Sequence, residues 1–285
     1  MSEVATDQVV QTINPTNGNS LEYYEYMSNQ EVNESISACH QAFLNWRHVS
    51  IKDRAEVIQG IGKALNDHKD ELAQLMTDEM GKTLKQSKQE VDLCAAICRY
   101  TAENGPEALK TEERDMVNGN KGRISYAPIG VVYGIQPWNY PAYQVVRYSI
   151  ASLMAGNGVL LKHASNVTGT GKLLEKIYRK GGLPDNLFTT LVIDHDQSDE
   201  IIKNRLVRGV TLTGSPGAGK KIGEKAAAEL KKTVLELGSN DAYLVLEDAD
   251  VDKAVKICTQ GRIYNNGETC IAAKRFIVTE KVYDE

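Results

Sequence analysis

Two residues near the end of the chain, Glu236 and Cys270, carry side chains suited to covalent acyl chemistry. Glu236 lies in an apolar run that ends in a Gly-Ser turn, and Cys270 follows the polar, turn-forming residues 265–269. A carboxylate can take a proton from water, and a thiolate can attack a carbonyl carbon. A cysteine by itself is usually a buried structural residue, but the polar segment before Cys270 favours an accessible thiol.

A third candidate, Asn139, lies between two prolines in residues 136–141. The prolines restrict the backbone on both sides, so the amide of Asn139 would be held rigidly. A rigid amide is a good donor to an oxyanion that develops during acyl transfer. The alternative is a proline-rich turn in which Asn139 has only a capping role.

From residue 128 onward, strands rich in Val, Ile and Leu alternate with helical segments. Continuous apolar runs predict a parallel sheet covered by helices on both faces, hence an α/β fold. Ligands bind at the carboxyl ends of such strands, so the loops after residues 135, 162, 213 and 237 should converge. The expected strands are 129–135, 158–162, 187–193, 208–213, 232–237 and 242–246. The expected helices are 142–154, 167–180, 197–204, 217–230 and 250–262.

The first third of the chain is predicted to have a structural role, because it lacks glycine loops and clusters of titratable residues. Two short strands are expected within residues 8–26, followed by helices over 28–46, 51–78 and 83–102. A polar segment near residues 110–128 predicts an arm that leaves the domain and returns. Such an edge strand either pairs across an oligomer interface or forms a plain surface hairpin.

Composition excludes several classes of function. The 285 residues carry a net charge of −5 with no basic stripe, which argues against nucleic acid as a partner. The polar N-terminus shows no signal peptide, and no membrane span is visible. The five cysteines form no CxxC pair and lie near no histidine cluster, so we expect no metal site and a reducing cytoplasm.

Two segments have features of a nucleotide site. Lys162 ends an expected strand and can reach a ribose or phosphate, while no carboxylate occurs up to Ser165 to repel a 2′-phosphate. Ser165 as a helix cap is the alternative. Gly214 to Lys220 matches GxxxxGK of a phosphate-binding P-loop, but Lys221 replaces the magnesium-binding hydroxyl residue. The other interpretations are a strand–Gly-Ser–helix turn that faces a pyrophosphate, or a glycine turn needed only for packing.

Five motifs in order resemble the aldehyde dehydrogenase superfamily, most closely its bacterial succinate-semialdehyde dehydrogenase type. They are PWNYP (137–141), GNGVLLKHAS (156–165), VTLTGS (210–215), LELGS (235–239) and GETC (267–270). The resemblance implies a cysteine nucleophile, Cys270, and an oxyanion hole formed by Asn139 and the backbone N–H of Cys270. It implies that Glu236 activates water, and that a thioester forms when hydride passes to NADP or NAD. The implied cofactor contacts are Ile135, Pro137, Trp138, Lys162, His163, Ala164, Ser165, Gly214, Ser215 and Leu237.

The resemblance also implies a substrate class, short semialdehyde acids such as succinate semialdehyde, with a general aliphatic aldehyde as the alternative. Arg147 stands where the family type binds the distal carboxylate, and Tyr140 lies in the same segment. A second arginine is typical at the position of Tyr264, and Arg262 lies two residues earlier. Ser239 replaces the second glycine of the usual LELGG, so a backbone adjustment near the base is expected.

The family is longer than this chain, which corresponds to roughly its first three fifths. We therefore expect an NAD(P)-binding domain over residues 1–237 and the start of a catalytic domain over 238–285, with the remainder absent. The full-length protein is expected to form a homo-oligomer, either a dimer or a tetramer. Besides the P-loop NTPase, the alternative function is a catalytically inactive fragment that binds the cofactor.

Overall fold

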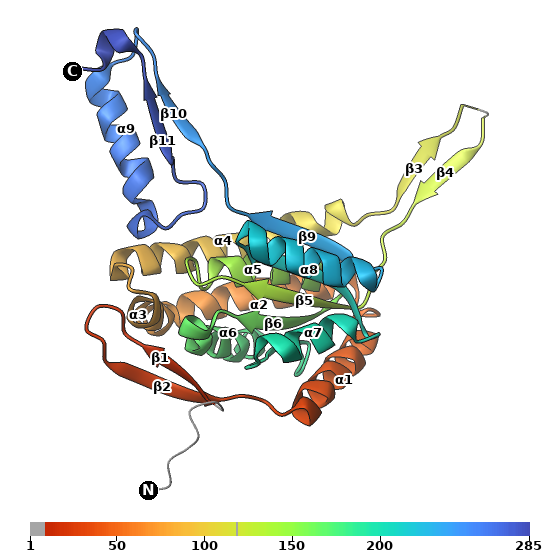
Figure 1. The fold of residues 1–285 in the computed structure, drawn as a ribbon. Helices are drawn as coiled ribbons and strands as arrows, with labels where there is room; N and C mark the ends of the chain where they lie inside the picture. Colours follow the sequence, from red (N-terminus) through yellow and green to blue (C-terminus); the bar gives the residue numbers. More distant parts are fainter. Residues whose placement is uncertain (1–8, 118) are drawn as a thin grey trace, which may run out of the picture.

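A five-stranded parallel sheet occupies the centre of the molecule in this computed structural model, which describes residues 9–117 and 119–285 (Figure 1). The α/β fold class expected from the continuous apolar runs is confirmed. Residues 1–8, which include the start of the expected N-terminal strand pair, and residue 118 of the expected arm lie outside the described residues. The strand order is β7 (Phe188–Thr190), β6 (Gly158–His163), β5 (Val131–Gln136), β8 (Val207–Gly214) and β9 (Lys232–Leu237).

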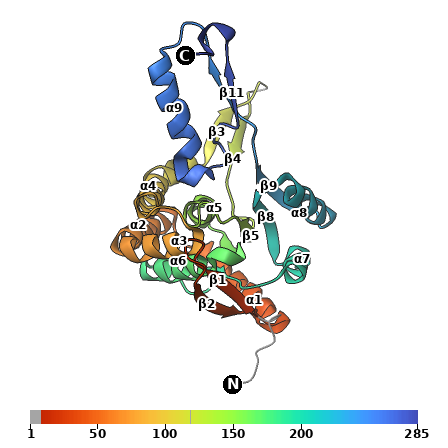
Figure 2. The same cartoon turned by 60° about the vertical axis from the view of Figure 1, so that its left-hand side comes forward.

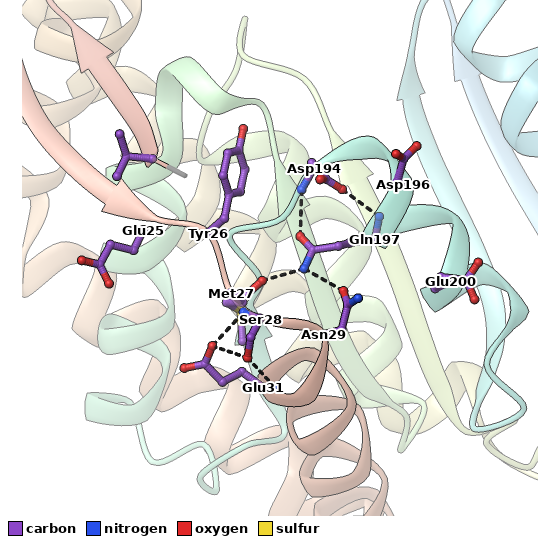
Figure 3. Close-up of a pocket in the computed structure, with 11 residues that line it drawn as sticks. Glu25, Tyr26, Met27, Ser28, Asn29, Glu31, Asp194, Asp196, Gln197 and Glu200 are labelled. Atoms are coloured by element: carbon purple, nitrogen blue, oxygen red, sulfur yellow. Dashed lines mark hydrogen bonds between the residues drawn. The ribbon is translucent and has the colours of Figure 1, made fainter. Parts of the chain in front are cut away.

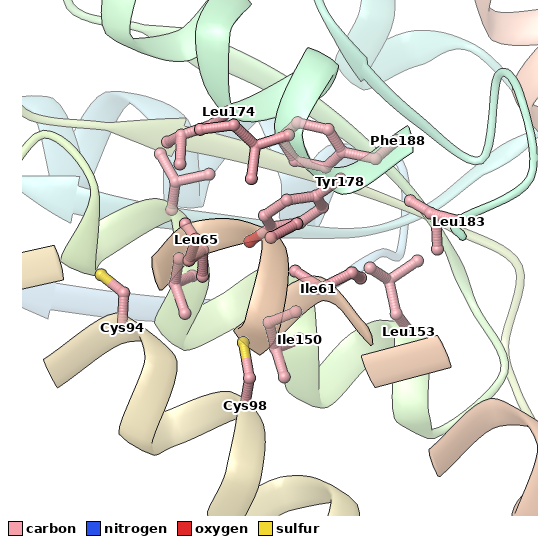
Figure 4. Close-up of a cluster of buried hydrophobic side chains, with 14 of the residues drawn as sticks. Ile61, Leu65, Cys94, Cys98, Ile150, Leu153, Leu174, Tyr178, Leu183 and Phe188 are labelled. Atoms are coloured by element: carbon pink, nitrogen blue, oxygen red, sulfur yellow. The ribbon is translucent and has the colours of Figure 1, made fainter. Parts of the chain in front are cut away.

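Helices cover both faces of this sheet, because its inner strands are apolar on both sides. One face carries α5 (Tyr143–Met154) and α6 (Thr168–Lys180), with α2 (Ile51–Asp67), α3 (Lys69–Met80) and α4 (Leu84–Ala108) outside them. The other carries α1 (Asn29–Trp46), α7 (His195–Lys203) and α8 (Pro216–Ala228). Between α2, α4, α5 and α6 lies the larger core, where Ile61, Leu65 and Tyr178 are fully buried (Figure 4).

The N-terminal region begins with an antiparallel pair, β1 (Val9–Ile13) and β2 (Ser20–Glu25). Helix α1 then starts at a capping box, in which Ser28 and Glu31 satisfy each other's backbone N–H groups. The prediction of one helix over 51–78 is wrong, because α2 ends at Asp67 and α3 begins at Lys69. His68 leaves helical geometry with φ −108° while the apolar spacing continues across it, which hides the break from sequence.

Two parts of the chain project from this body, a β-hairpin arm and a C-terminal β–α–β segment. The arm formed by β3 (Glu112–Asp115) and β4 (Lys121–Ile124) extends away from the sheet in both views (Figures 1 and 2). The C-terminal segment pairs β10 (Ala242–Val245) with β11 (Arg275–Val278) in parallel and connects them through α9 (Val251–Ile263). The short helix η3 (Tyr264–Gly267) ends α9 on the side that faces α4.

Candidate active site

The predicted nucleophile, Cys270, is exposed and follows a loop of unusual backbone geometry. Three consecutive residues, Asn265, Asn266 and Gly267, have left-handed φ values of 54°, 56° and 78°. Asparagine and glycine are the residue types that adopt this region at low cost, so the Asn-Asn-Gly sequence explains the sharp turn after α9. The turn leads the chain back toward the central sheet and leaves the Cys270 thiol accessible.

The predicted oxyanion donor meets this loop, although it lies about a hundred residues earlier in the chain. The Asn139 amide nitrogen donates a hydrogen bond of 2.8 Å to the carbonyl of Glu268. Next to it, the hydroxyls of Tyr140 and Thr269 form a hydrogen bond. Burial raises the pKa of Tyr140 to about 12, so the phenol stays neutral and can donate. The loop after β5 therefore holds the two residues that precede Cys270.

Ser239, the departure from the glycine-rich form of its motif, also contacts the nucleophile. Its hydroxyl lies 3.0 Å from the carbonyl of Cys270 and 2.6 Å from a carboxylate oxygen of Asp241. The Lys274 ammonium donates to the same Cys270 carbonyl at 2.7 Å. The backbone of Ser239 has no positive φ, so a serine is accommodated at this position without left-handed geometry.

The predicted base and the predicted substrate residue pair with each other. A guanidinium nitrogen of Arg147 lies 3.4 Å from a carboxylate oxygen of Glu236, and both side chains are partly exposed. Arg147 extends from α5 past the ring of Tyr143, whereas Glu236 projects from the edge strand β9. Arg262 does not join this pair. It donates to the carbonyl of Gly267 at 2.8 Å and so supports residues 264–270, the nucleophile loop that leads to Cys270.

Two neighbouring pockets contain most of the predicted cofactor residues. One, of about 590 Å³, is bordered by α7 and α8 and is lined by Ile135, Lys162 and Ser215. The other, of about 350 Å³, is lined by Trp138, Lys162, His163, Ala164 and Ser165. Lys162 lines both, so three of the four loops expected to converge, those after β5, β6 and β8, meet here, whereas the loop after residue 237 lines neither pocket. Pro137, Gly214 and Leu237 line neither pocket.

The 590 Å³ pocket is lined by three lysines and by two carboxylates, Asp196 and Asp199, so its charge is positive overall and suits an anionic dinucleotide. Lys221 and Lys225, which sequence reasoning missed, line the 590 Å³ pocket on the α8 side. Burial lowers the pKa of Lys162, and the Asp194 carboxylate opposes that effect. Asp194 was also missed, although its spacing to Gln197 is that of the capping box that starts α7.

His163 does not present its ring as a free cofactor ligand. The ring is buried, with Nε2 2.9 Å from the carbonyl of Pro141 and Nδ1 3.0 Å from the amide of Ala164. Because Nδ1 accepts from Ala164, the hydrogen lies on Nε2, which donates to Pro141. Burial lowers the pKa of His163 to about 4, so the ring is neutral. Its bond to Pro141 joins residues 137–142, the Asn139 loop, to β6.

The P-loop alternative lacks its loop. Helix α8 begins at Pro216, directly after its cap Ser215, whose hydroxyl accepts from the amide of Ala218 at 3.2 Å. Residues up to Lys220 are therefore already helical, and Lys220 is exposed on the helix. The geometry is the strand–turn–helix arrangement instead. In residues 9–117 and 119–285, no group of three His, Cys, Asp or Glu side chains is arranged to hold a metal ion.

A further pocket of about 640 Å³ lies where α1 and α7 begin (Figure 3). Glu25, Glu31 and Asp196 are among the acidic residues that line it. Gln197 crosses it and donates to the carbonyl of Met27 at 2.6 Å. Two pairs of its polar side chains, Ser28 with Glu31 and Asp194 with Gln197, serve as helix caps, and its negative charge does not suit a phosphate-bearing cofactor.

Comparison with known proteins agrees with this geometry. The model of the aldehyde dehydrogenase family matches residues 3–285. The chain is 41% identical over 271 residues to the succinate semialdehyde dehydrogenase of Escherichia coli K12, covering 95% of this chain and 58% of that protein. It is 40% identical to a probable succinate-semialdehyde dehydrogenase of Synechocystis, covering 97% of this chain and 61% of that protein.

The succinic semialdehyde dehydrogenase of Streptococcus pyogenes, solved with NADP+, superimposes with a TM-score of 0.93 at 34% identity. That match covers 96% of this chain and 60% of the solved chain. The chain therefore spans about three fifths of the length of its relatives. No helix in the described part of the chain is long and apolar enough to cross a membrane. With the family model matching nearly every residue, this chain belongs to the aldehyde dehydrogenase family.

Proposed function

We propose that the protein oxidises a short semialdehyde acid, such as succinate semialdehyde, to the carboxylate with NADP+ or NAD+. The observation that carries the proposal is the contact between the Asn139 amide and the loop that ends at Cys270, 2.8 Å at Glu268. The pockets that share Lys162 open beside this contact and fit a dinucleotide. Relatives named as succinate-semialdehyde dehydrogenases support the substrate class.

The cofactor would be held by Lys162, Ser165 and Ser215, with Trp138 lining the pocket next to Asn139. When bound, its nicotinamide supplies the hydride acceptor. Lys162 and Lys221 offer positive charge to phosphate groups, whereas Lys225 is paired with Asp199. Ser165 adds no carboxylate against a 2′-phosphate, and Asp194, which lines the same pocket, interacts with Lys162. We therefore expect NADP+ to bind at least as well as NAD+.

The protein's own residues divide the acyl chemistry between them. The thiolate of Cys270 forms a bond to the aldehyde carbon, and the Asn139 amide stabilises the oxygen that becomes negative. After oxidation the acyl group is a thioester on Cys270. Glu236 then takes a proton from water as the water adds to the thioester carbon, and the C–S bond breaks to release the carboxylate and the thiolate.

Arg147 links this chemistry to a charged substrate. Its guanidinium pairs with Glu236 at 3.4 Å and is partly exposed, so a carboxylate arriving from solvent can reach it. An arginine binds carboxylates in a planar, bidentate geometry, which suits the distal group of a semialdehyde acid. Binding there competes with Glu236 and frees the base when a substrate is present.

The test is aldehyde-dependent NADPH formation by the protein and its variants. Cys270→Ala is expected to abolish turnover, whereas Glu236→Gln should preserve one rapid hydride transfer per site and block the steady state. Cofactor binding is measured separately by calorimetry. If the protein binds NADP+ yet no aldehyde yields NADPH, the proposal fails and the protein is a cofactor-binding fragment.

The substrate class is tested with Arg147→Met on succinate semialdehyde and on butanal, which has the same chain length without the carboxylate. Loss of a charged hydrogen bond should lower kcat/KM about tenfold or more for the acid and leave butanal nearly unchanged. Arg179→Met, which removes a surface ion pair with Glu175, is the matched control. An equal loss on both aldehydes would contradict a role for Arg147 in carboxylate binding.

Three further expectations belong to this proposal. We propose that residues 238–285 begin a catalytic domain, because β10, β11 and α9 project from the main sheet (Figure 2). We propose that the β3–β4 arm mediates homo-oligomerisation, since Met116, Ile124 and Tyr126 are exposed along it. Sedimentation of a variant lacking the arm tests this. The five free cysteines support a reducing, cytoplasmic location.

A further inference from the structure

A buried ion pair lies next to the contact between the two halves of the candidate site, which are the loop that carries Asn139 and the loop that leads to Cys270. Lys82, in the turn between α3 and α4, has a fully buried side chain that bonds the carboxylate of Glu90 on α4, itself 1% exposed. The second Glu90 oxygen accepts the backbone amides of Ala142 and Tyr143, each at 2.8 Å. Glu90 thus fixes the end of the Asn139 loop where α5 begins.

Lys82 also bonds both halves of the site. Its ammonium lies 3.1 Å from the side-chain oxygen of Asn265 and 3.4 Å from the carbonyl of Asn139. Asn265 closes the triangle by donating to the same Asn139 carbonyl at 2.7 Å. The ammonium also lies 4.8 Å from the centre of the Tyr140 ring, within the range of a cation–π contact.

The nucleophile loop has few other ties to the body of the molecule. Among the described residues, every hydrogen bond from 264–270 to the chain before residue 238 reaches 81–82 or 139–140. One of them runs from the Asn266 side chain to the carbonyl of Gly81 at 3.0 Å. The relative position of the two loops is therefore set by their direct bonds together with the turn that carries Lys82.

We propose that Lys82 and Glu90 are positioning residues that set the Asn139 amide and the Cys270 loop in one fixed relation. The inference deepens the proposed function and rests on it for the roles of Asn139 and Cys270. Glu90 compensates the charge of the buried ammonium, but a buried N–H group that loses its neutral acceptor is left unsatisfied. The acceptors Asn139 and Asn265 therefore cannot drift apart without a cost in free energy. An apolar residue in place of Lys82 would fill space without imposing this geometry.

The test uses the chain without any aldehyde, so it remains informative if the proposed reaction fails. The change is Lys82→Met, and the matched control is Lys88→Met, which removes an exposed ion pair with Asp70 in the same region. Amide hydrogen exchange of residues 264–272 should become about tenfold faster in the first variant only, while α2 stays protected. Unchanged exchange in a folded Lys82→Met protein overturns the proposal.

Two readouts separate positioning from general loosening. Alkylation of Cys270 is compared with that of Cys258 on α9 in the same molecule by peptide mass spectrometry; only the ratio reports movement of the loop. Acrylamide quenching of Trp138 reports the Asn139 loop, because the other tryptophan, Trp46, is buried. Lys82→Met should change both. A change shared equally by Cys258, with Trp138 unaffected, indicates a purely structural pair and overturns the proposal.

A second variant keeps the proposal testable if Lys82→Met does not fold. Asn265→Gly permits the left-handed backbone and leaves the Lys82–Glu90 pair intact, so no charge is stranded. It removes the side chain that joins Lys82 to the nucleophile loop. The Cys270-to-Cys258 alkylation ratio should shift in this variant and not in Asn186→Gly, a left-handed asparagine in another loop. Equal ratios in the two variants would exclude the role.

Discussion

The buried ring of His163 predicts a specific loss of stability in mild acid. Burial lowers its pKa from 6.5 to about 4, against the opposing effect of the Pro141 and Gln136 carbonyls. A histidine with a depressed folded pKa binds its proton more tightly when unfolded. Its contribution to stability is therefore complete above about pH 6.5 and is lost as the pH falls toward about 4.

The size of the effect follows from these two values. Between about pH 8 and about pH 5, one such group reduces the free energy of unfolding by on the order of 2 kcal/mol. Protonation also places a hydrogen on Nδ1, which now accepts from the amide of Ala164. The added hydrogen can donate to the Gln136 carbonyl, 3.3 Å from Nδ1, and the Nε2 bond to Pro141 is unchanged, so the loss of stability comes from burying the charge.

The assay is urea denaturation of the parent and of His163→Gln across that pH range. Glutamine keeps a donor directed toward Pro141 and does not titrate. The buried carboxyl of Glu79, whose pKa is raised by burial, changes stability in the opposite direction, since it favours folding most when protonated. Only the difference between the two proteins isolates His163. If both lose stability equally with acid, the reasoning about this ring is refuted.

Three further changes follow from single contacts. Tyr133→Phe removes a buried hydroxyl that bonds Ser198 at 2.8 Å, and urea denaturation should show a free energy of unfolding lower by about 1 kcal/mol. An unchanged free energy would show that the contact contributes nothing. Gly134→Ala would put a methyl 2.2 Å from the Tyr148 ring, and thermal unfolding should show a free energy of unfolding lower by about 1–3 kcal/mol. An unchanged Tm would mean that the ring moves aside freely. Ser239→Gly deletes a bond to the Cys270 carbonyl; we expect faster alkylation of that thiol with a stability change under about 1 kcal/mol, and unaltered alkylation would argue against the contact.

The sheet and its crevice could be predicted because their signals are local. The runs around Val159, Val210 and Val234 are apolar and bounded by turns, and strands β6, β8 and β9 form there. Parallel strands then place their carboxyl ends together, so Lys162 and Ser215 meet in one pocket. No knowledge of side-chain packing was needed for that step.

The contacts among charged residues could not be predicted in the same way. In sequence, Lys82 and Glu90 resemble solvated residues around the start of a helix, and Arg147 and Glu236 lie far apart. Whether a charge is buried depends on which segments meet over it, and that is decided by tertiary packing. His163 was predicted to contact the cofactor, but its ring bonds the carbonyl of Pro141. This bond could not be predicted because the two residues are neighbours only in the folded structure.

These charged contacts suggest how the site assigns separate tasks to its cations. The Lys82 ammonium is buried with Glu90 and bonds backbone and amide oxygens, so its charge serves geometry and is out of reach of solvent. Arg147 is partly exposed and holds Glu236 by a single contact of 3.4 Å, a pair that contributes about 1 kcal/mol or less. So weak a pair is easily exchanged for a bidentate substrate carboxylate, whereas the buried pair is not. In the proposed function, the rigid cation fixes where the acyl chemistry occurs, and the exchangeable one couples the base to the charge of the substrate.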